Sequence, residues 1–264
     1  MMFSLPLFKQ SVRSNAVMWG AMTSVMTLLC TQFAALEMTQ NLLFVIFYGM
    51  MTTILPGIYV LVTANKLIAG QVDRGSMAYV LSTPIKRSSV VFTQMVFLVG
   101  SLVGMFGVMT LVHLAVNQAK PITLATAMGM GAVGGNDAMS AMMTGDLTSS
   151  MILKVNLSAL VVCIAMAAVC FAFSGIFSSS KYSVGLSGSF VGVTILANML
   201  AMFGSMGVSG LDKFKYLTIC SFYDYKSVLL SDNDWIFKMI FPALISLAAF
   251  TAGAVVFKKK DLPL

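Results

Sequence analysis

Charged residues are scarce in this sequence. Only 9% of its 264 residues are charged, whereas 58% are hydrophobic, and the mean hydropathy is +0.92. A soluble domain carries about 25% charged residues, and a chain of this length leaves a large area exposed to its solvent. These proportions exclude a purely water-soluble fold, so part of the protein surface must face lipid.

The residue types that build metal sites, nucleotide sites and nucleic-acid grooves are also few. The chain has one histidine, His113, and four cysteines with no CxxC pair, which argues against a zinc or iron–sulfur site. It has no GxxxxGK[ST] phosphate-binding loop. The basic residues behind the net charge of +7 are spread between apolar stretches, without interleaved aromatics. We expect no catalytic residue, no cofactor or metal site, and no nucleic-acid partner for this chain.

Long apolar stretches are abundant. A helix needs about 20 apolar residues to cross the hydrocarbon core of a bilayer. The sequence therefore predicts an all-α polytopic membrane protein, with residues 1–264 forming a single transmembrane domain. Its six predicted membrane-spanning helices cover residues 16–36, 42–62, 90–116, 151–177, 184–206 and 236–257.

The basic residues are distributed unequally between the two sides of these spans. With the N-terminus inside, ten of the 16 lysines and arginines lie on the cytoplasmic side, including all three arginines. Cytoplasmic loops carry such an excess, so we expect both termini to be cytoplasmic. The segment before the first span, with Leu5, Phe8 and Val12 on one helical face beside Lys9 and Arg13, predicts an interfacial helix.

The predicted cytoplasmic loop after the second span has an unusual pattern. Ala64, Leu67, Ile68 and Val72 recur at helical spacing, and Gly75 is suited to a helix C-terminus. A second short apolar run, residues 77–81, ends before Thr83-Pro84. The loop is thus predicted to form two short amphipathic helices at the inner membrane surface. They either dock onto a cytoplasmic partner or rest among lipid headgroups, and the pattern alone fits both.

Three motifs of this chain, taken in order, resemble one protein family. The loop contains Asp73, Gly75-Ser76, Val80-Leu81 and Ser82-Thr83-Pro84-Ile85-Lys86-Arg87. The external run 215–225 and the basic-Asp-Leu ending at 258–262 follow. This combination resembles the membrane subunits of ATP-binding-cassette (ABC) transporters of the type-2 exporter family. The sequence departs from the family pattern at Gln71 and Gln94, where relatives often have glutamate and lysine.

The resemblance implies a permease, the subunit that forms the translocation pathway of an exporter. It implies that region 64–83 is a coupling helix seated on a separate nucleotide-binding ATPase, which would hold ATP and magnesium. It also implies a homodimer, or a heterodimer with a similar permease, in a cell membrane, and we expect a bacterial plasma membrane. The predicted ATPase-docking residues are Asp73, Arg74, Gly75, Ser76, Tyr79, Leu81, Pro84 and Arg87.

The external segment 207–234 is both aromatic and charged. The family likeness implies short re-entrant helices here, before the last span, whereas an ordinary interfacial aromatic belt would have the same composition. Phe214, Tyr216, Phe222 and Tyr223 are the predicted residues of an external gate.

Small and polar residues within the spans give further predictions. Gly100 with Gly104, and Gly188 with Gly192, form small-xxx-small patterns that predict close helix packing. The polar residues at depth, each a candidate for substrate contact or for an ordinary structural role, are Asn156, Asn198, His113, Lys154 and Lys238.

Alternative functions differ in the residues that they require. An ion-coupled secondary carrier needs buried acids near the bilayer midplane, and none of the nine acidic residues lies deep in a predicted span. An intramembrane enzyme needs a catalytic constellation that one histidine does not supply. A non-transporting scaffold remains open. The substrate remains open as well: a drug, a peptide or a lipid-like amphiphile would each suit an exporter.

Overall fold

The computed structural model describes residues 3–77, 86–127, 145–205, 208, 210–229 and 234–260. Within these residues six helical segments are long and apolar enough to cross a membrane, which confirms the predicted all-α fold. One of the six combines a π-helix with the α-helix that follows it. The long elements are α1 (Leu5–Ala35), η1 (Leu43–Met51) with α3 (Thr52–Leu67), α6 (Arg87–Ala119), α9 (Ser149–Ile176), α10 (Ser180–Ser205) and α12 (Asp234–Lys259).

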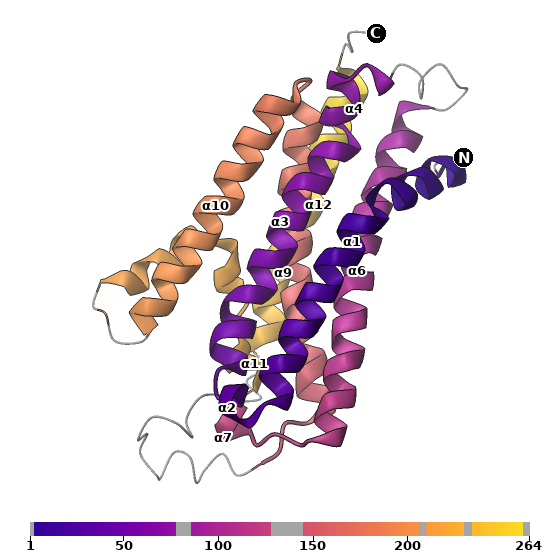
Figure 1. The fold of residues 1–264 in the computed structure, drawn as a ribbon. Coiled ribbons are helices and arrows are strands. Elements are labelled where there is room, and N and C mark those ends of the chain that lie inside the picture. The colour runs from indigo at the N-terminus through magenta and orange to yellow at the C-terminus, as the bar shows by residue number, and fades with distance from the viewer. Residues whose placement is uncertain are drawn as a thin grey trace.

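Short helices connect the long ones at both ends of the bundle. They are α2 (Glu37–Gln40), α4 (Ala69–Asp73), α7 (Leu124–Ala127), η2 (Leu211–Leu217), η3 (Ile219–Phe222) and α11 (Tyr225–Leu229). Figure 1 shows both chain ends and α4 at one end of the bundle, and α2 and α7 at the other. The two termini lie at the same end because the chain passes along the bundle an even number of times, once for each of the six long segments. We refer to the two ends as the terminal end and the α2 end.

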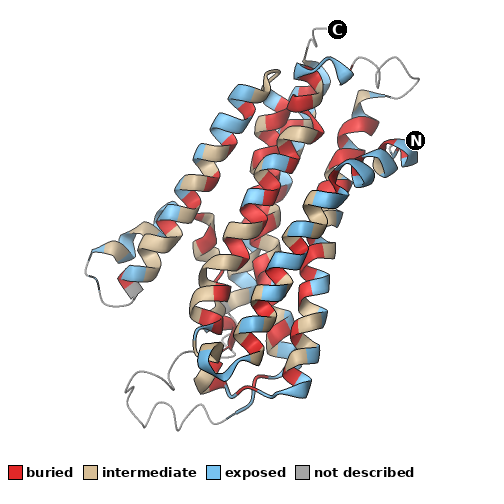
Figure 2. Cartoon of the chain, in the orientation of Figure 1, coloured by how far each residue is buried: buried red, intermediate tan, exposed pale blue. Residues whose placement is uncertain are grey.

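Helix α9 is the central element of the bundle. It packs against α12, α3, α6 and α10, and Figure 2 shows buried residues along it and along α3, whereas α10 is largely exposed or intermediate. The approach of α9 to α12 is very close: a Cβ added to Gly253 would lie 2.9 Å from the Ala172 Cα, and one added to Gly175 would lie 2.8 Å from the Gly253 oxygen. The two backbones therefore touch, which gives the van der Waals packing that holds membrane helices together.

The glycines of the two predicted packing motifs behave differently from one another. A Cβ at Gly104 would lie 3.3 Å from the Trp19 ring of α1, and one at Gly188 would lie 4.0 Å from Leu61 of α3. A Cβ at Gly100 or Gly192 would meet no described atom within 4 Å. Within the described residues, one glycine of each motif faces a neighbouring helix and the other faces open space.

The first turns of α1 pack against α6 through polar groups. The Ser4 backbone N–H donates to the Thr93 hydroxyl at 3.0 Å, and the Ser11 hydroxyl donates to the Gln94 side-chain oxygen at 2.8 Å. Leu5 and Val12 are exposed, as lipid-facing residues would be. Residues 5–15 are continuous with the first span, although Figure 1 shows them angled away from the rest of α1. Their position at a membrane surface stays a prediction.

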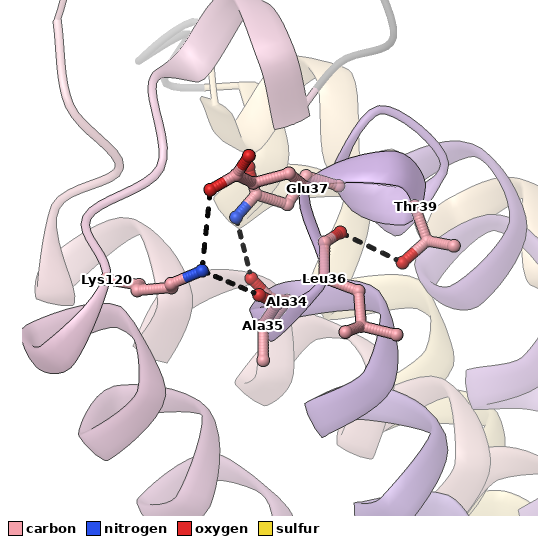
Figure 3. Close-up of polar contacts among 7 residues, drawn as sticks. Ala34, Ala35, Leu36, Glu37, Thr39 and Lys120 are labelled. Atoms are coloured by element: carbon pink, nitrogen blue, oxygen red, sulfur yellow. Dashed lines mark hydrogen bonds and ion pairs between the residues drawn. The ribbon is translucent and has the colours of Figure 1, made fainter.

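A cluster of polar contacts holds α1 and α6 together at the α2 end (Figure 3). The Lys120 amine lies 3.5 Å from a Glu37 carboxylate oxygen and 3.4 Å from the Ala35 carbonyl oxygen, to which it donates. The Gln40 amide donates to the Ala34 oxygen at 3.0 Å. These contacts satisfy carbonyls at the C-terminus of α1, where no further turn of helix can bond them.

The contact between α9 and α12 gives a stability prediction. Gly253→Ala introduces a methyl group against the α9 backbone, which cannot move aside as a flexible side chain would. We expect a loss of about 1–3 kcal/mol, measured by thermal or denaturant unfolding in detergent. Gly107→Ala is the matched control, because nothing lies within 4 Å of its added Cβ. It should be neutral or stabilising by up to about 1 kcal/mol, since alanine favours the helix. Equal effects of the two changes would contradict this account.

Candidate functional site

The predicted docking loop begins with a sharp turn at the terminal end of the bundle. Helix α3 stops at Leu67, and Ile68 adopts φ −128° and ψ −73° before α4 begins. Ala64, Leu67 and Ile68 are buried, so the predicted apolar face does pack onto the bundle. Helix α4 ends at Asp73, and Gly75 follows in a left-handed conformation with φ +71°. Glycine adopts this conformation without a steric penalty, which makes it the usual residue just after a helix.

Two side-chain hydrogen bonds attach this loop to other spans. The Ala69 backbone N–H, at the start of α4, donates to the Ser174 hydroxyl of α9 at 2.9 Å in a buried position. The Asn65 amide donates to the Ser180 hydroxyl at the start of α10 at 2.7 Å. The turn between α3 and α4 is therefore bonded to α9 and α10 at the same end of the bundle, so a displacement of α4 would act on three spans at once.

The predicted docking residues separate into three groups. Asp73, Arg74, Gly75 and Ser76 are exposed and consecutive; we call them the α4 turn. The Ser76 hydroxyl donates to the Gln71 carbonyl oxygen at 3.1 Å, which ties the turn back onto α4. Arg87 instead starts α6, is partly buried and donates to the Lys260 carbonyl oxygen at 2.8 Å. Tyr79, Leu81 and Pro84 lie outside the described residues.

A second polar region lies in the half of the bundle nearer the α2 end. The Tyr48 hydroxyl is 2.7 Å from His113 Nδ1 and donates to the Asn156 side-chain oxygen at 3.2 Å. All three residues are buried, and they come from η1, α6 and α9 respectively. With Tyr48 donating to Asn156, the His113 Nδ1 carries the proton and donates to the Tyr48 oxygen. This Tyr48–His113–Asn156 cluster links three spans inside the protein.

The cluster depends on the π-helix η1. The wider turn of a π-helix displaces backbone carbonyls from the α-helical hydrogen-bond pattern, and π-helical turns are frequent at functional sites. Here side chains bond several of these carbonyls: Thr52 donates to Tyr48 at 2.8 Å, Thr53 to Met50 at 2.9 Å, and Asn198 of α10 to Gly49 at 2.9 Å. Asn198, a polar residue noted at depth in the sequence, thus fastens α10 to η1.

The four predicted gate residues do not form one cluster. Phe214 and Tyr216 lie on η2, where Tyr216 is 82% exposed. Phe222 stacks on Phe241 of α12, with ring centroids 5.5 Å apart. Tyr223 is buried and its ring centroid lies 6.4 Å from that of Tyr225. The segment therefore exposes Tyr216, leaves Phe214 half-buried, and packs Phe222 and Tyr223 within the protein.

The middle of the external segment reaches deep into the bundle. The Thr218 hydroxyl donates to the Thr194 carbonyl at 3.1 Å, and Thr194 is near the midpoint of α10. Cys220 is buried beside Thr53, the second residue of α3. Figure 1 likewise shows the helices after α10 between the two ends of the bundle. The backbone of this segment is thus partly covered by protein, as a re-entrant segment needs, and its re-entry into the membrane stays a prediction.

The end of the external segment is tied to the last span by an ion pair. The Lys238 amine lies 2.9 Å from an Asp224 carboxylate oxygen. Lys238 was one of the polar residues noted at depth, and this pairing gives it a structural partner. Tyr225, the residue after Asp224, stacks on Phe44 of η1. Burial and the Asp224 carboxylate raise the pKa of Tyr225 to about 12, so its phenol stays neutral.

The chain is similar to one family of known proteins along nearly its full length. Its sequence matches the family described as ABC-2 family transporter protein over residues 3–262. The chain belongs to the ABC-2 transporter family. It is thus a multi-pass permease subunit of an ABC transporter, of a kind that works with an ABC ATPase subunit. No curated protein matches the chain closely enough to count as a relative.

Sequence reasoning singled out His113 and Asn156 of this permease, but it missed Tyr48, which joins them. The three residues are widely separated in sequence: Tyr48 precedes His113 by 65 positions and Asn156 by 108. No single motif signals their meeting. A tyrosine, a histidine and an asparagine at similar depths in three different spans would have been the available signal.

The cluster gives a testable prediction. Tyr48→Phe keeps the ring but removes the hydroxyl, which leaves His113 Nδ1 and the Asn156 oxygen buried without that partner. We expect a loss of about 1–3 kcal/mol in stability, measured by thermal unfolding in detergent. Tyr182→Phe serves as the control, because Tyr182 is 65% exposed. If Tyr48→Phe unfolds at the same temperature as Tyr182→Phe, the cluster does not stabilise the bundle.

Proposed function

We propose that this permease forms the translocation pathway of an ABC exporter and receives the motion of its ATPase at the α4 turn. Asp73, Arg74, Gly75 and Ser76 carry this proposal, because they are exposed together at the terminal end while the residues before them are buried. The ATPase would bind ATP and magnesium, and this chain would bind neither. The terminal end would then be cytoplasmic, as the distribution of basic residues predicts.

The attachment of α4 supports a lever mechanism. ATP-driven closure of two ATPase subunits would displace α4, and the bond between Ala69 and Ser174 would transmit that displacement to α9. The bond between Asn65 and Ser180 would transmit it to α10. Rigid helices move as units over packed interfaces. A displacement at the terminal end would therefore reach Asn198 and the external segment through α10.

The composition of the spans supports an amphipathic substrate over an ion. Asp234, the first residue of α12, is the one aspartate or glutamate in the six long helices, and it precedes the apolar part of that helix. Coupling to a proton or sodium gradient uses buried acids within the spans. The buried polar side chains of the interior are mostly neutral amides, hydroxyls and one imidazole. Walls of this kind suit a drug, a peptide or a lipid-like amphiphile that offers both apolar area and hydrogen-bonding groups.

A second permease copy, identical or similar, would complete the pathway. The face of α10 supports this, because Val184, Val193 and Leu196 are exposed and the Cβ of a residue at Gly185 or Gly192 would meet nothing within 4 Å. Figure 1 shows α10 leaning away from the rest of the bundle. A surface with both apolar side chains and small residues is suited to close contact with another helix.

The main test of the proposal is dependence on ATP. The permease should be co-expressed with candidate ABC ATPases, purified as a complex and reconstituted into proteoliposomes. We expect transport of an amphipathic probe to require ATP hydrolysis, and hydrolysis to rise when the probe is present. Transport under an ion gradient without ATP, with no ATPase co-purifying, would refute the exporter proposal and favour a secondary carrier.

The α4 turn can be tested separately within that complex. Arg74→Glu reverses a charge on the exposed turn, and Gly75→Pro forbids the positive φ that follows α4. We expect both variants to insert and fold but to lose at least about ten-fold in ATPase co-purification or probe-stimulated hydrolysis, equivalent to about 1.4 kcal/mol. Lys181→Glu is the control, because it reverses an exposed charge at the same end, on α10. Wild-type coupling in Arg74→Glu and Gly75→Pro would place the docking surface elsewhere.

A further inference from the structure

A groove runs between α6 and α12 at the terminal end of the bundle. Its volume is about 210 Å³. Its lining includes the two polar residues Ser88 and Lys258, and the other lining residues are apolar. The apolar residues are Val91, Phe92, Met95, Ala254 and Val255. We call this the α6–α12 groove.

The polar and apolar parts of the groove lie at different depths. Ser88 is in the first turn of α6, and Lys258 is in the last turn of α12. Met95 is seven residues further along α6, which is about 10 Å deeper at the rise of an α-helix. Ala254 is one turn deeper than Lys258. The groove therefore leads from a cation and a hydroxyl at the membrane surface into the hydrocarbon region.

Other basic residues are close in sequence to the mouth of the groove, although the Lys260 amine donates to the Ile176 carbonyl oxygen of α9. Lys86 and Arg87 precede Ser88, while Lys259 and Lys260 follow Lys258. The Arg87 guanidinium donates to the Lys260 carbonyl oxygen, which holds the start of α6 against the end of α12. Basic pockets between spans at the cytoplasmic surface bind anionic lipid headgroups. The mouth is complementary to a negative group, and the interior is complementary to an alkyl chain.

We propose that the α6–α12 groove binds one anionic phospholipid. Its phosphate contacts the Lys258 amine and the Ser88 hydroxyl, and one acyl chain lies along Phe92, Met95 and Val255. The bound lipid joins the span that follows the docking loop to the C-terminal span. The groove shares no lining residue with the α4 turn, so this site does not depend on docking at that turn.

Two other grooves on the spans lack this combination. The groove between α1 and α6 is larger, about 370 Å³, but its lining of Phe8, Asn15, Trp19 and neighbours contains no charged side chain. The groove between α6 and α9 offers Thr110 and Asn156 among apolar residues and again no charge. Either could accept an apolar chain, but neither selects a negative headgroup. The α6–α12 groove differs from both because Lys258 is part of its lining.

Native mass spectrometry of the purified permease in detergent, titrated with phosphatidylglycerol or phosphatidylcholine of the same chains, tests the charge requirement. We expect one phosphatidylglycerol to bind in preference to phosphatidylcholine, and Lys258→Gln to weaken that binding about five-fold. Lys259→Gln is the matched control, since it removes the same charge from the adjacent position, which does not line the groove. Equal losses in the two variants, or equal binding of the two lipids, would overturn the proposal.

Filling the groove with a large side chain tests whether binding requires space for the acyl chain of the lipid. Ala254→Trp fills the apolar part of the groove without changing its charge, and it should abolish the binding of phosphatidylglycerol. Val256→Trp adds the same side chain at an exposed position of α12 outside the groove, and it should leave lipid binding unchanged. Circular dichroism and unfolding temperature establish that both variants fold.

Other occupants of the groove give different results. Ala254→Trp that binds lipid normally but changes the oligomeric state would assign the groove to a second permease copy. If inorganic phosphate stabilises the wild-type protein as much as phosphatidylglycerol does, the groove is an anion site to which the acyl chain contributes nothing. Either result overturns the phospholipid assignment, and neither bears on whether the α4 turn docks an ATPase.

Discussion

The direct contact between the backbones of α9 and α12 is the interaction on which the rest of the bundle depends. Lipid is as apolar as the side chains of the spans, so burial of apolar area gives little force between helices in a membrane. Close packing must supply the attraction instead. At Gly253 and Gly175 the two helices approach until no side chain fits between them. This contact fixes α12 to the central helix, and α3, α6 and α10 then pack around α9.

The position of α9 brings the two candidate functional regions into one mechanical unit. At the terminal end its Ser174 accepts the bond from the start of α4. Nearer the other end its Asn156 belongs to the buried cluster with Tyr48 and His113. Helix α10 provides a parallel link, since Ser180 contacts Asn65 at one end and Asn198 contacts the π-helix further along. Two stiff helices thus connect the exposed α4 turn of this ABC-2 permease with the region beside η2 and η3.

The sequence predicts the spans well because apolar length depends only on local composition. All six predicted spans are present in the structure. Their observed bounds differ from the predicted ones mainly where a helix extends past its apolar stretch, as α1 does by starting at Leu5. The exposed turn at Asp73–Ser76 was also recognisable, because a left-handed glycine after a helix has a local signature. Contacts between spans were not predictable in the same way. The glycine motifs predicted packing at Gly100, Gly104, Gly188 and Gly192, of which Gly104 and Gly188 face a neighbouring helix. The backbone contact between α9 and α12 instead uses Gly175 and Gly253, which lie outside both motifs.

The π-helix was missed for a related reason. Residues 43–51 are uniformly apolar and aromatic, so their sequence does not distinguish a π-helix from an α-helix of the same length. The contact from outside this stretch is tertiary: Asn198 of α10 donates to the Gly49 carbonyl oxygen of η1. Local contacts add to it, since Thr52 and Thr53 bond carbonyls three or four residues back, and Phe44 and Tyr48 stack with centroids 4.8 Å apart. The hydrogen-bond donor from α10, Asn198, is 149 positions away from Gly49 in sequence, so no local pattern indicates the bond.

The π-helix also has an evolutionary consequence. Its wider turns hold more residues than an α-helix of equal length. The π-helix η1 can therefore be explained by the insertion of one residue into an ancestral α-helix, which left the span continuous. Removing one residue from 43–51 would let this stretch wind as an α-helix, and each residue on one side of the deletion would turn by about 100° relative to the other. Tyr48 would then leave His113 and face a different neighbour. The register of the second span is therefore recorded in the length of η1 as much as in the identity of its side chains.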